Sequence, residues 1–128
     1  MICDANVILR YILDDIEKLS QKAAEILENE PVFIPFEVVA EVVYVLEKVY
    51  KANRRALSEA IIELAAYKNI ETVNKDILTY ALKLFSQSRL DFVDTVLCGY
   101  SYVQQAEIIT FDRKLQNKIQ QIRKTQHS

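Results

Sequence analysis

Residues 1–10 read MICDANVILR, and this stretch predicts how the chain is built. The apolar run at residues 1–3 is typical of a short strand, and Asp4 stands where that run stops. Apolar residues at helical spacing follow at once: Val7, Ile8, Tyr11 and Ile12. A strand that turns into a helix at an acid puts a carboxylate at the edge of a sheet, where ligands bind in open α/β folds. The simpler interpretation is that Asp4 or Asn6 only caps the helix.

The composition indicates a folded chain with its own core. At 128 residues, 51% of them hydrophobic, one domain over residues 1–128 is expected and disorder is not. The net charge of −2 gives no overall attraction to nucleic acid, so any such contact must be local. Cys3 and Cys98 lie in apolar runs without metal-ligand spacing and are interpreted as reduced core thiols. No apolar run is long enough to span a membrane and no signal sequence is evident, so a soluble, cytoplasmic protein is predicted.

Short strands and longer helices alternate along the rest of the chain. Helices are expected over about 16–29, 35–50, 56–67, 76–85 and 91–103, with a last basic helix that starts near Arg113 and frays into a polar tail. Strands are expected at 31–35, 70–73 and 108–111. Gly99 lies inside a helical pattern and is interpreted as allowing close packing.

This alternation predicts the fold class. Strands that alternate with helices form parallel sheets through right-handed crossovers, and helices cover both faces. We therefore expect an α/β fold, a three-layer α/β/α sandwich with a short, mainly parallel central sheet. With only one glycine in the chain, long irregular loops and a glycine-rich phosphate loop are both excluded.

Several acids fit a purely structural role poorly. Asp4 and Asp112 each follow a predicted strand, and if those strands are neighbours both carboxylates lie at one sheet edge, although each could also be a helix cap. Glu41 has mostly apolar neighbours one helical turn away, which predicts a position at the margin of the buried stripe, unless it turns outward beside Lys48. Asp91 and Asp94 suit a cap and a first-turn acid, or Asp94 turns inward toward the same edge.

Carboxylates that converge on one crevice repel each other, and a divalent cation removes that cost. Ligation by oxygen alone suits Mg²⁺ or Mn²⁺. The single histidine, His127, rules out a histidine-rich zinc site and counts against Ser-His or Cys-His catalysis, because it lies near the end of the chain.

Four segments together resemble the PIN-domain family, most closely the VapC-like toxins of bacterial and archaeal toxin–antitoxin pairs. They are DANVILRYIL at residues 4–13, PFEVVAEVVYVL at 35–46, DFVDTVLCG at 91–99 and IITFDRKL at 108–115. The resemblance implies a metal-dependent endoribonuclease that dimerises and is neutralised by a small antitoxin. It matches Asp4, Glu41, Asp94 and Asp112 to the family's acidic quartet around Mg²⁺ or Mn²⁺, with Asp91 at the margin of the site. It also matches Asn6 and Thr110 to polar positions that orient the first and last acids.

An acidic site needs basic residues beside it to hold RNA phosphates. The candidates are Arg10, Lys48, Arg54, Arg55, Arg113, Lys114 and Lys118, each of which could instead be part of a solvated helix face. Three other functions stay open: a PIN-like module that binds RNA or protein without cutting, an RNA-processing nuclease that is not a toxin, and a phosphotransfer enzyme with Asp4 as nucleophile. Against the last, Asn6 stands where a phosphatase of the D-x-D type has its second acid.

Overall fold

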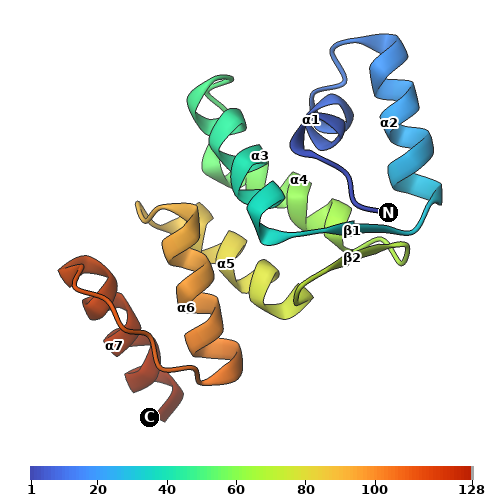
Figure 1. Cartoon of the computed structure of the whole chain (residues 1–128). Helices are drawn as coiled ribbons and strands as arrows, with labels where there is room; N and C mark the ends of the chain where they lie inside the picture. Colours follow the sequence, from blue (N-terminus) through green and yellow to red (C-terminus); the bar gives the residue numbers. More distant parts are fainter. Residues whose placement is uncertain (128) are drawn as a thin grey trace. The chain divides into compact units, whose positions relative to one another are not determined.

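The computed structural model describes residues 1–127 and divides the chain into two compact units, Met1–Lys75 and Asp76–Ser128 (Figure 1). The first unit contains α1 (Ala5–Leu13), α2 (Glu17–Asn29), β1 (Val32–Ile34), α3 (Phe36–Lys48), α4 (Arg54–Ala65) and β2 (Ile70–Thr72). The second contains α6 (Phe92–Gln104), α7 (Arg113–His127) and all but the first residue of α5 (Lys75–Gln87).

A short parallel sheet lies within the first unit. β1 and β2 pair in parallel, with Val32 opposite Ile70 and Ile34 opposite Thr72, and the chain passes between them through α3 and α4. The Thr72 hydroxyl donates to the Ile34 carbonyl oxygen at 2.7 Å and ties the end of one strand to the other. Helix α1 packs on α2 and α3, α3 packs on α4, and α4 packs on β2. The predicted PIN-like α/β fold with a short parallel sheet is therefore confirmed.

The first residues form less sheet than the sequence predicted. Residues 1–3 make only an isolated parallel bridge between Ile2 and Phe33, because α1 begins at Ala5 and leaves too little chain for a ladder. Two backbone contacts still hold this end: the Phe33 amide donates to the Met1 carbonyl oxygen at 2.7 Å, and the Met1 amine donates to the Pro31 carbonyl oxygen at 3.1 Å.

Capping side chains and left-handed residues set the ends of several helices. The Asn53 side chain accepts a hydrogen bond from the Ala56 amide at 2.8 Å, so α4 starts at Arg54 and not at Ala56 as predicted. Helices α1 and α6 end in residues with left-handed backbone, Asp14 at φ 49° and Gln105 at φ 53°. Neither residue is a glycine.

The core of the second unit lies between α6 and α7. Cys98 of α6 clusters with Leu115, Ile119 and Ile122 of α7, and Ile108 packs against this cluster. The rings of Tyr80 and Tyr102 stack with centroids 4.4 Å apart and join α5 to α6. Helix α7 continues through His127, so the predicted frayed end is not found in the described residues.

The predicted strand at residues 108–111 is wrong. Helix α6 ends at Gln104 and α7 begins at Arg113, and no strand is present within the described part of the second unit. The side chains nevertheless alternate as in a strand: Ile108 and Thr110 are half-buried, whereas Ile109 is 86% exposed and Phe111 is 99% exposed. Without a neighbouring strand in its own unit, the segment keeps the side-chain pattern but has no ladder of backbone hydrogen bonds.

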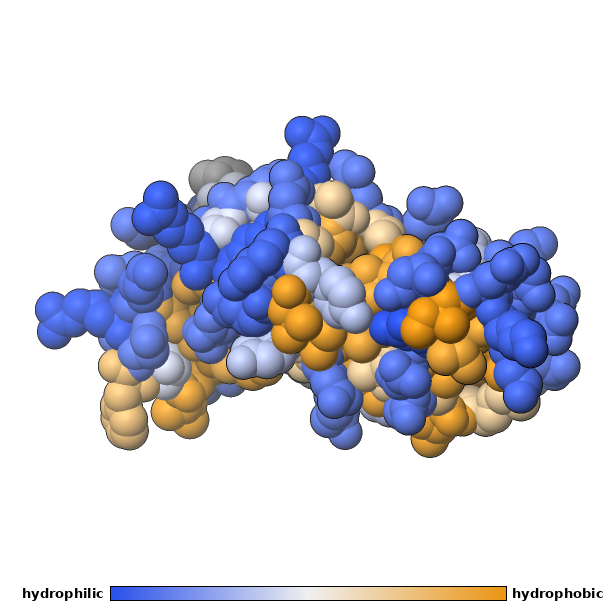
Figure 2. Space-filling view, turned by 90° about the horizontal axis from the view of Figure 1, so that it is seen from above, coloured by the Kyte–Doolittle hydropathy of each residue, from blue (hydrophilic) through white to orange (hydrophobic). Residues whose placement is uncertain are grey.

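Two further predictions can be compared with the structure. Cys3 and Cys98 are both buried and form no disulfide, as predicted for core cysteines. Among the described helices, none is long and apolar enough to cross a bilayer. On the face drawn in Figure 2, apolar side chains reach the surface in patches among hydrophilic ones.

Gly99 lies where α6 passes close to α5. A Cβ atom at this position would lie 3.0 Å from both the Cγ2 atom and the carbonyl oxygen of Ile77 in α5. The carbonyl oxygen is part of a helix backbone and cannot rotate away. Gly99 therefore permits close packing, as the sequence predicted.

We expect Gly99→Ala to lower the free energy of unfolding by about 1–2 kcal/mol. Overpacking costs about 1–3 kcal/mol, and the better helix propensity of alanine offsets up to about 1 kcal/mol of that. Urea unfolding measures the change, with Gln104→Ala at an exposed site on the same helix as the control. If Gly99→Ala were as stable as the wild type, the close approach of Ile77 would cost no more than the gain in helix propensity.

Candidate functional site

Asp4 combines a capping role with an exposed carboxylate. Its backbone is extended just before α1, and its Oδ1 atom accepts a hydrogen bond from the Val7 amide at 3.3 Å. The capping interpretation is therefore correct, yet it occupies only one carboxylate oxygen. Asn6 is exposed on the first turn of α1, and its amide has no partner among the described residues.

Glu41 is exposed on α3, although its neighbours Val42 and Val43 are buried. Of the two positions that the sequence left open, the structure shows the outward one. Consequently, the cost of burying a carboxylate gives no argument for a metal at Glu41. Its candidacy depends on its place in the sequence motif alone.

Three acids of the second unit share one electrostatic environment. Burial raises the pKa of the Asp94 carboxyl above its usual value, and the negative charges of Asp91 and Asp112 raise it further. Asp91 occupies the N-cap position of α6, but its side chain makes no capping hydrogen bond. Asp94, in the first turn, is the half-buried member of this group, whereas Asp91 and Asp112 are exposed.

Asp112 is held from both sides. Its Oδ1 atom accepts a hydrogen bond from the Leu115 amide at 2.9 Å, and its own amide donates to the Thr110 hydroxyl at 3.0 Å. Asp112 thus caps α7 as Asp4 caps α1. Thr110 contacts the backbone of the acid, a geometry suited to the orienting role that the resemblance implied.

The acids of the predicted quartet divide between the two compact units. Asp4 and Glu41 belong to the first, and Asp94 and Asp112 belong to the second. Within each unit, the described residues contain no group of three or more His, Cys, Asp or Glu side chains positioned to hold a metal ion.

The chemistry of the donors nonetheless suits a hard divalent cation. The candidates offer carboxylate oxygens alone, which are the ligands of Mg²⁺ and Mn²⁺. A cation near Asp94 would also offset the repulsion from Asp91 and Asp112 that raises its pKa. The donor chemistry of Asp91, Asp94 and Asp112 therefore suits such an ion, although the described side chains form no group of three positioned to hold one.

Several candidate phosphate contacts are engaged within the first unit. Arg54 donates through Nε to Glu47 at 2.7 Å, and the Lys48 Nζ atom lies 3.8 Å from the same carboxylate. Arg10 donates to Asp15 at 2.8 Å and to the Tyr50 hydroxyl at 3.4 Å. These partners reduce the charge that Arg54 and Arg10 offer to RNA.

The other basic candidates form weaker ion pairs or have no ion-pair partner in the described chain. Arg55 pairs with Glu59 at 3.2 Å, with both side chains mostly exposed, and exposed pairs contribute little to stability. Arg113 and Lys114 are exposed in the first turn of α7, directly after Asp112, and have no ion-pair partner in the described chain. Lys118 is half-buried on α7, and its charge opposes the rise in pKa, to about 11, that burial causes at the Cys98 thiol.

The polar face of α7 was not predicted as a candidate surface. Gln116, Gln120 and Arg123 recur at helical spacing and line a pocket together with residues 107–110. Their helical spacing was visible in the sequence, but uncharged amides on a helix surface indicate a binding site only when a cavity lies beside them.

Comparison with known proteins adds one match. The model of the PIN domain family matches residues 1–120, which span both compact units and include all the acids named above. No curated protein and no solved structure matched the sequence. The family match covers most of the chain and agrees with the short parallel sheet, so this chain belongs to the PIN-domain family.

Proposed function

We propose that this chain is an endoribonuclease that requires Mg²⁺ or Mn²⁺, hydrolyses RNA phosphodiester bonds and is the toxin of a toxin–antitoxin pair. PIN domains are generally metal-dependent nucleases. The observation that carries the proposal is the family match over residues 1–120, because it spans Asp4, Glu41, Asp94 and Asp112 together.

In this proposal Asp4 and Asp94 bind the ion directly, and Glu41 and Asp112 complete the site directly or through water. When bound, the ion offsets the carboxylate charge and polarises a phosphoryl oxygen. Asp4 and Asp112 suit this role because a helix amide fixes one oxygen of each. Asp91 stays at the margin of the site as an additional negative charge.

Basic side chains beside the acids hold the RNA backbone. Arg113 and Lys114 are the strongest candidates in the second unit, because they are exposed and follow Asp112 directly. Arg55 and Lys48 can contribute after they release weak surface ion pairs. Such contacts are independent of base sequence and weaken as salt rises.

The toxin role includes a homodimer and a small antitoxin as partners. The gene neighbourhood tests this part of the proposal, since a short reading frame for an antitoxin beside this one would support it. Arrest of growth when the chain is expressed alone, relieved when the neighbour is co-expressed, would link the two. A nuclease that leaves growth unaffected would instead be an RNA-processing enzyme.

We expect Mg²⁺ or Mn²⁺ to raise the melting temperature and EDTA to reverse the effect. An ion that binds only the folded state at a concentration of 100 Kd stabilises it by about 2.7 kcal/mol, which is a shift of several degrees. Differential scanning fluorimetry measures the shift, with K⁺ at equal ionic strength as the control. A melting temperature that responds to neither ion nor chelator would contradict the metal site.

The paired variants Asp94→Asn and Asp91→Asn test the assignment within the second unit. We expect Asp94→Asn to abolish metal-dependent cleavage of single-stranded RNA and Asp91→Asn only to weaken it. Neutralising Asp94 also removes a carboxylate whose charged form is disfavoured, so the metal-free protein should lose no stability. If Asp91→Asn were the inactive variant, the roles within the pair would be reversed. If the wild type bound RNA without cutting it in either metal, the chain would be a non-catalytic binding module.

Glu41→Gln separates a functional carboxylate from an ordinary surface one. Because Glu41 is exposed, we expect the metal-free stability to change by less than about 0.5 kcal/mol. Loss of a ligand should reduce the metal-induced rise in melting temperature and cut RNA hydrolysis at least tenfold, about 1.4 kcal/mol in barrier. Glu37→Gln, also exposed on α3, is the matched control and should behave as the wild type. Normal hydrolysis and a normal metal response in Glu41→Gln would remove Glu41 from the site.

A further inference from the structure

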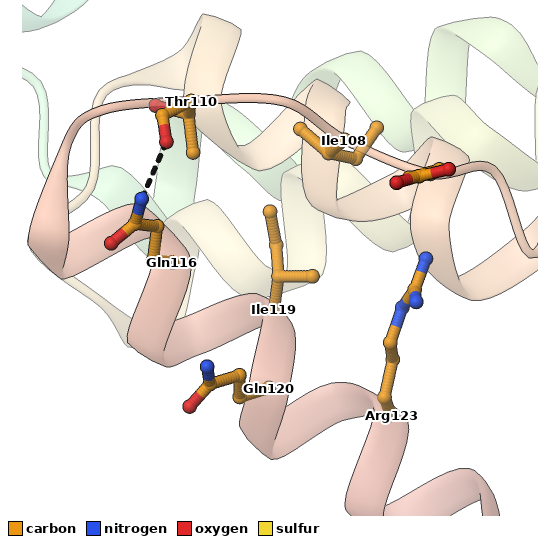
Figure 3. Close-up of a pocket in the computed structure, with 7 residues that line it drawn as sticks. Ile108, Thr110, Gln116, Ile119, Gln120 and Arg123 are labelled. Atoms are coloured by element: carbon orange, nitrogen blue, oxygen red, sulfur yellow. Dashed lines mark hydrogen bonds between the residues drawn. The ribbon is translucent and has the colours of Figure 1, made fainter.

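A pocket of about 390 Å³ lies in the second unit between residues 107–110 and one face of α7 (Figure 3). Its volume falls in the range of small-molecule sites, roughly 300–1,000 Å³. The acids discussed above do not line it, and the proposed function does not use it.

The pocket combines an apolar surface with polar edges. Figure 3 shows Ile108 of the extended segment and Ile119 of α7 pointing toward one another. Gln116 and Gln120 stand on the same face of the helix and line the pocket beside Ile119. The Gln120 amide has no partner among the described residues, so both its donor and its acceptor are available to a ligand.

The charges around the pocket favour a neutral ligand over a phosphate. Glu107 and Arg123 both line it, so one negative and one positive side chain balance each other. Arg123 already donates to the Ala106 carbonyl oxygen at 3.1 Å. A phosphate would meet the Glu107 carboxylate without a surplus of positive charge. A flat ring with hydrogen-bonding edges, by contrast, matches apolar side chains bordered by amides.

Thr110 connects this pocket to the predicted acidic site. Its carbonyl oxygen accepts a hydrogen bond from the Gln116 amide at 2.5 Å, shown in Figure 3, and its hydroxyl accepts one from the Asp112 amide at 3.0 Å. A ligand in the pocket therefore lies against the residue that holds Asp112. For an RNA strand with a phosphate near Asp112, the base of an adjacent nucleotide is the group within reach.

We propose that this pocket binds one unpaired nucleobase of the RNA, with the ring against Ile108 and Ile119 and its polar edge on Gln120. The inference rests on the proposed function for the identity of the ligand, since RNA brings the base to the site. The pocket would recognise a base, whereas the proposed hydrolysis needs contacts only with the RNA backbone. The nuclease would then cut with a preference at one nucleotide position beside the scissile bond.

Single abasic substitutions in a short fluorescent RNA test the proposal. Binding is measured by anisotropy in EDTA, so that metal-dependent cleavage does not consume the RNA. We expect removal of the base at one position to weaken binding by the wild type at least fivefold, because the RNA then loses the ring's contacts with Ile108 and Ile119 and its hydrogen bonds to Gln120. Gln120→Ala should weaken binding of the intact RNA threefold or more and respond less to the abasic position. Gln121→Ala, exposed on the same helix and outside the pocket lining, is the matched control and should equal the wild type.

Equal binding by Gln120→Ala and Gln121→Ala, or a wild type that tolerates removal of every base, would overturn the proposal. Melting curves verify that both variants are folded, as expected for changes at exposed positions. Cleavage of the same RNA in Mg²⁺ is scored separately. If the protein cut the RNA and neither binding nor cutting changed in Gln120→Ala, the nuclease proposal would hold and the proposal of a base pocket would be wrong. A base effect on binding without cutting would support the pocket and contradict the nuclease proposal.

Discussion

Hydrogen bonds from first-turn helix amides to carboxylates fix two of the candidate acids, Asp4 and Asp112, at the starts of α1 and α7. The Oδ1 atoms of Asp4 and Asp112 each accept such a bond, from Val7 and Leu115 respectively. A cap fixes the carboxylate relative to its helix while the second oxygen stays available. Capping and metal binding are therefore compatible at both positions. The same contact that starts a helix also prepares an oriented ligand.

Local patterns predicted the fold wherever an element depends on its own side chains. The helices were found because apolar residues recur at helical spacing, and β1 was found because prolines flank a short apolar run. The prediction of a strand at residues 108–111 failed because a strand also needs a partner backbone, which its own side chains do not supply. The exposed Ile109 and Phe111 alternate with the half-buried Ile108 and Thr110. The predicted alternation of side chains is therefore present, whereas the predicted pairing with a neighbouring strand is absent.

The candidate site residues were chosen by residue type and motif, and the structure adds their surroundings. Carboxylates after apolar runs marked Asp4 and Asp112 without any structure. The outward turn of Glu41 could not be foreseen, because residues at the margin of a helical stripe can face either way. Ion pairs such as Arg54 with Glu47 join separate helices and depend on tertiary packing. Only the structure therefore shows which of the candidate basic residues are already paired.

The placement of the single glycine has a consequence for the unfolded chain. Glycine usually serves left-handed helix ends, yet here Asp14, Lys51 and Gln105 adopt positive φ angles, and Gly99 is buried inside a helix. A left-handed residue with a side chain costs roughly 1–2 kcal/mol in the native state. A residue other than glycine also leaves the denatured ensemble fewer conformations to lose, a gain of about 0.4–1 kcal/mol that offsets only part of this cost. The strain at these three positions is thus offset in part by a more restricted unfolded chain.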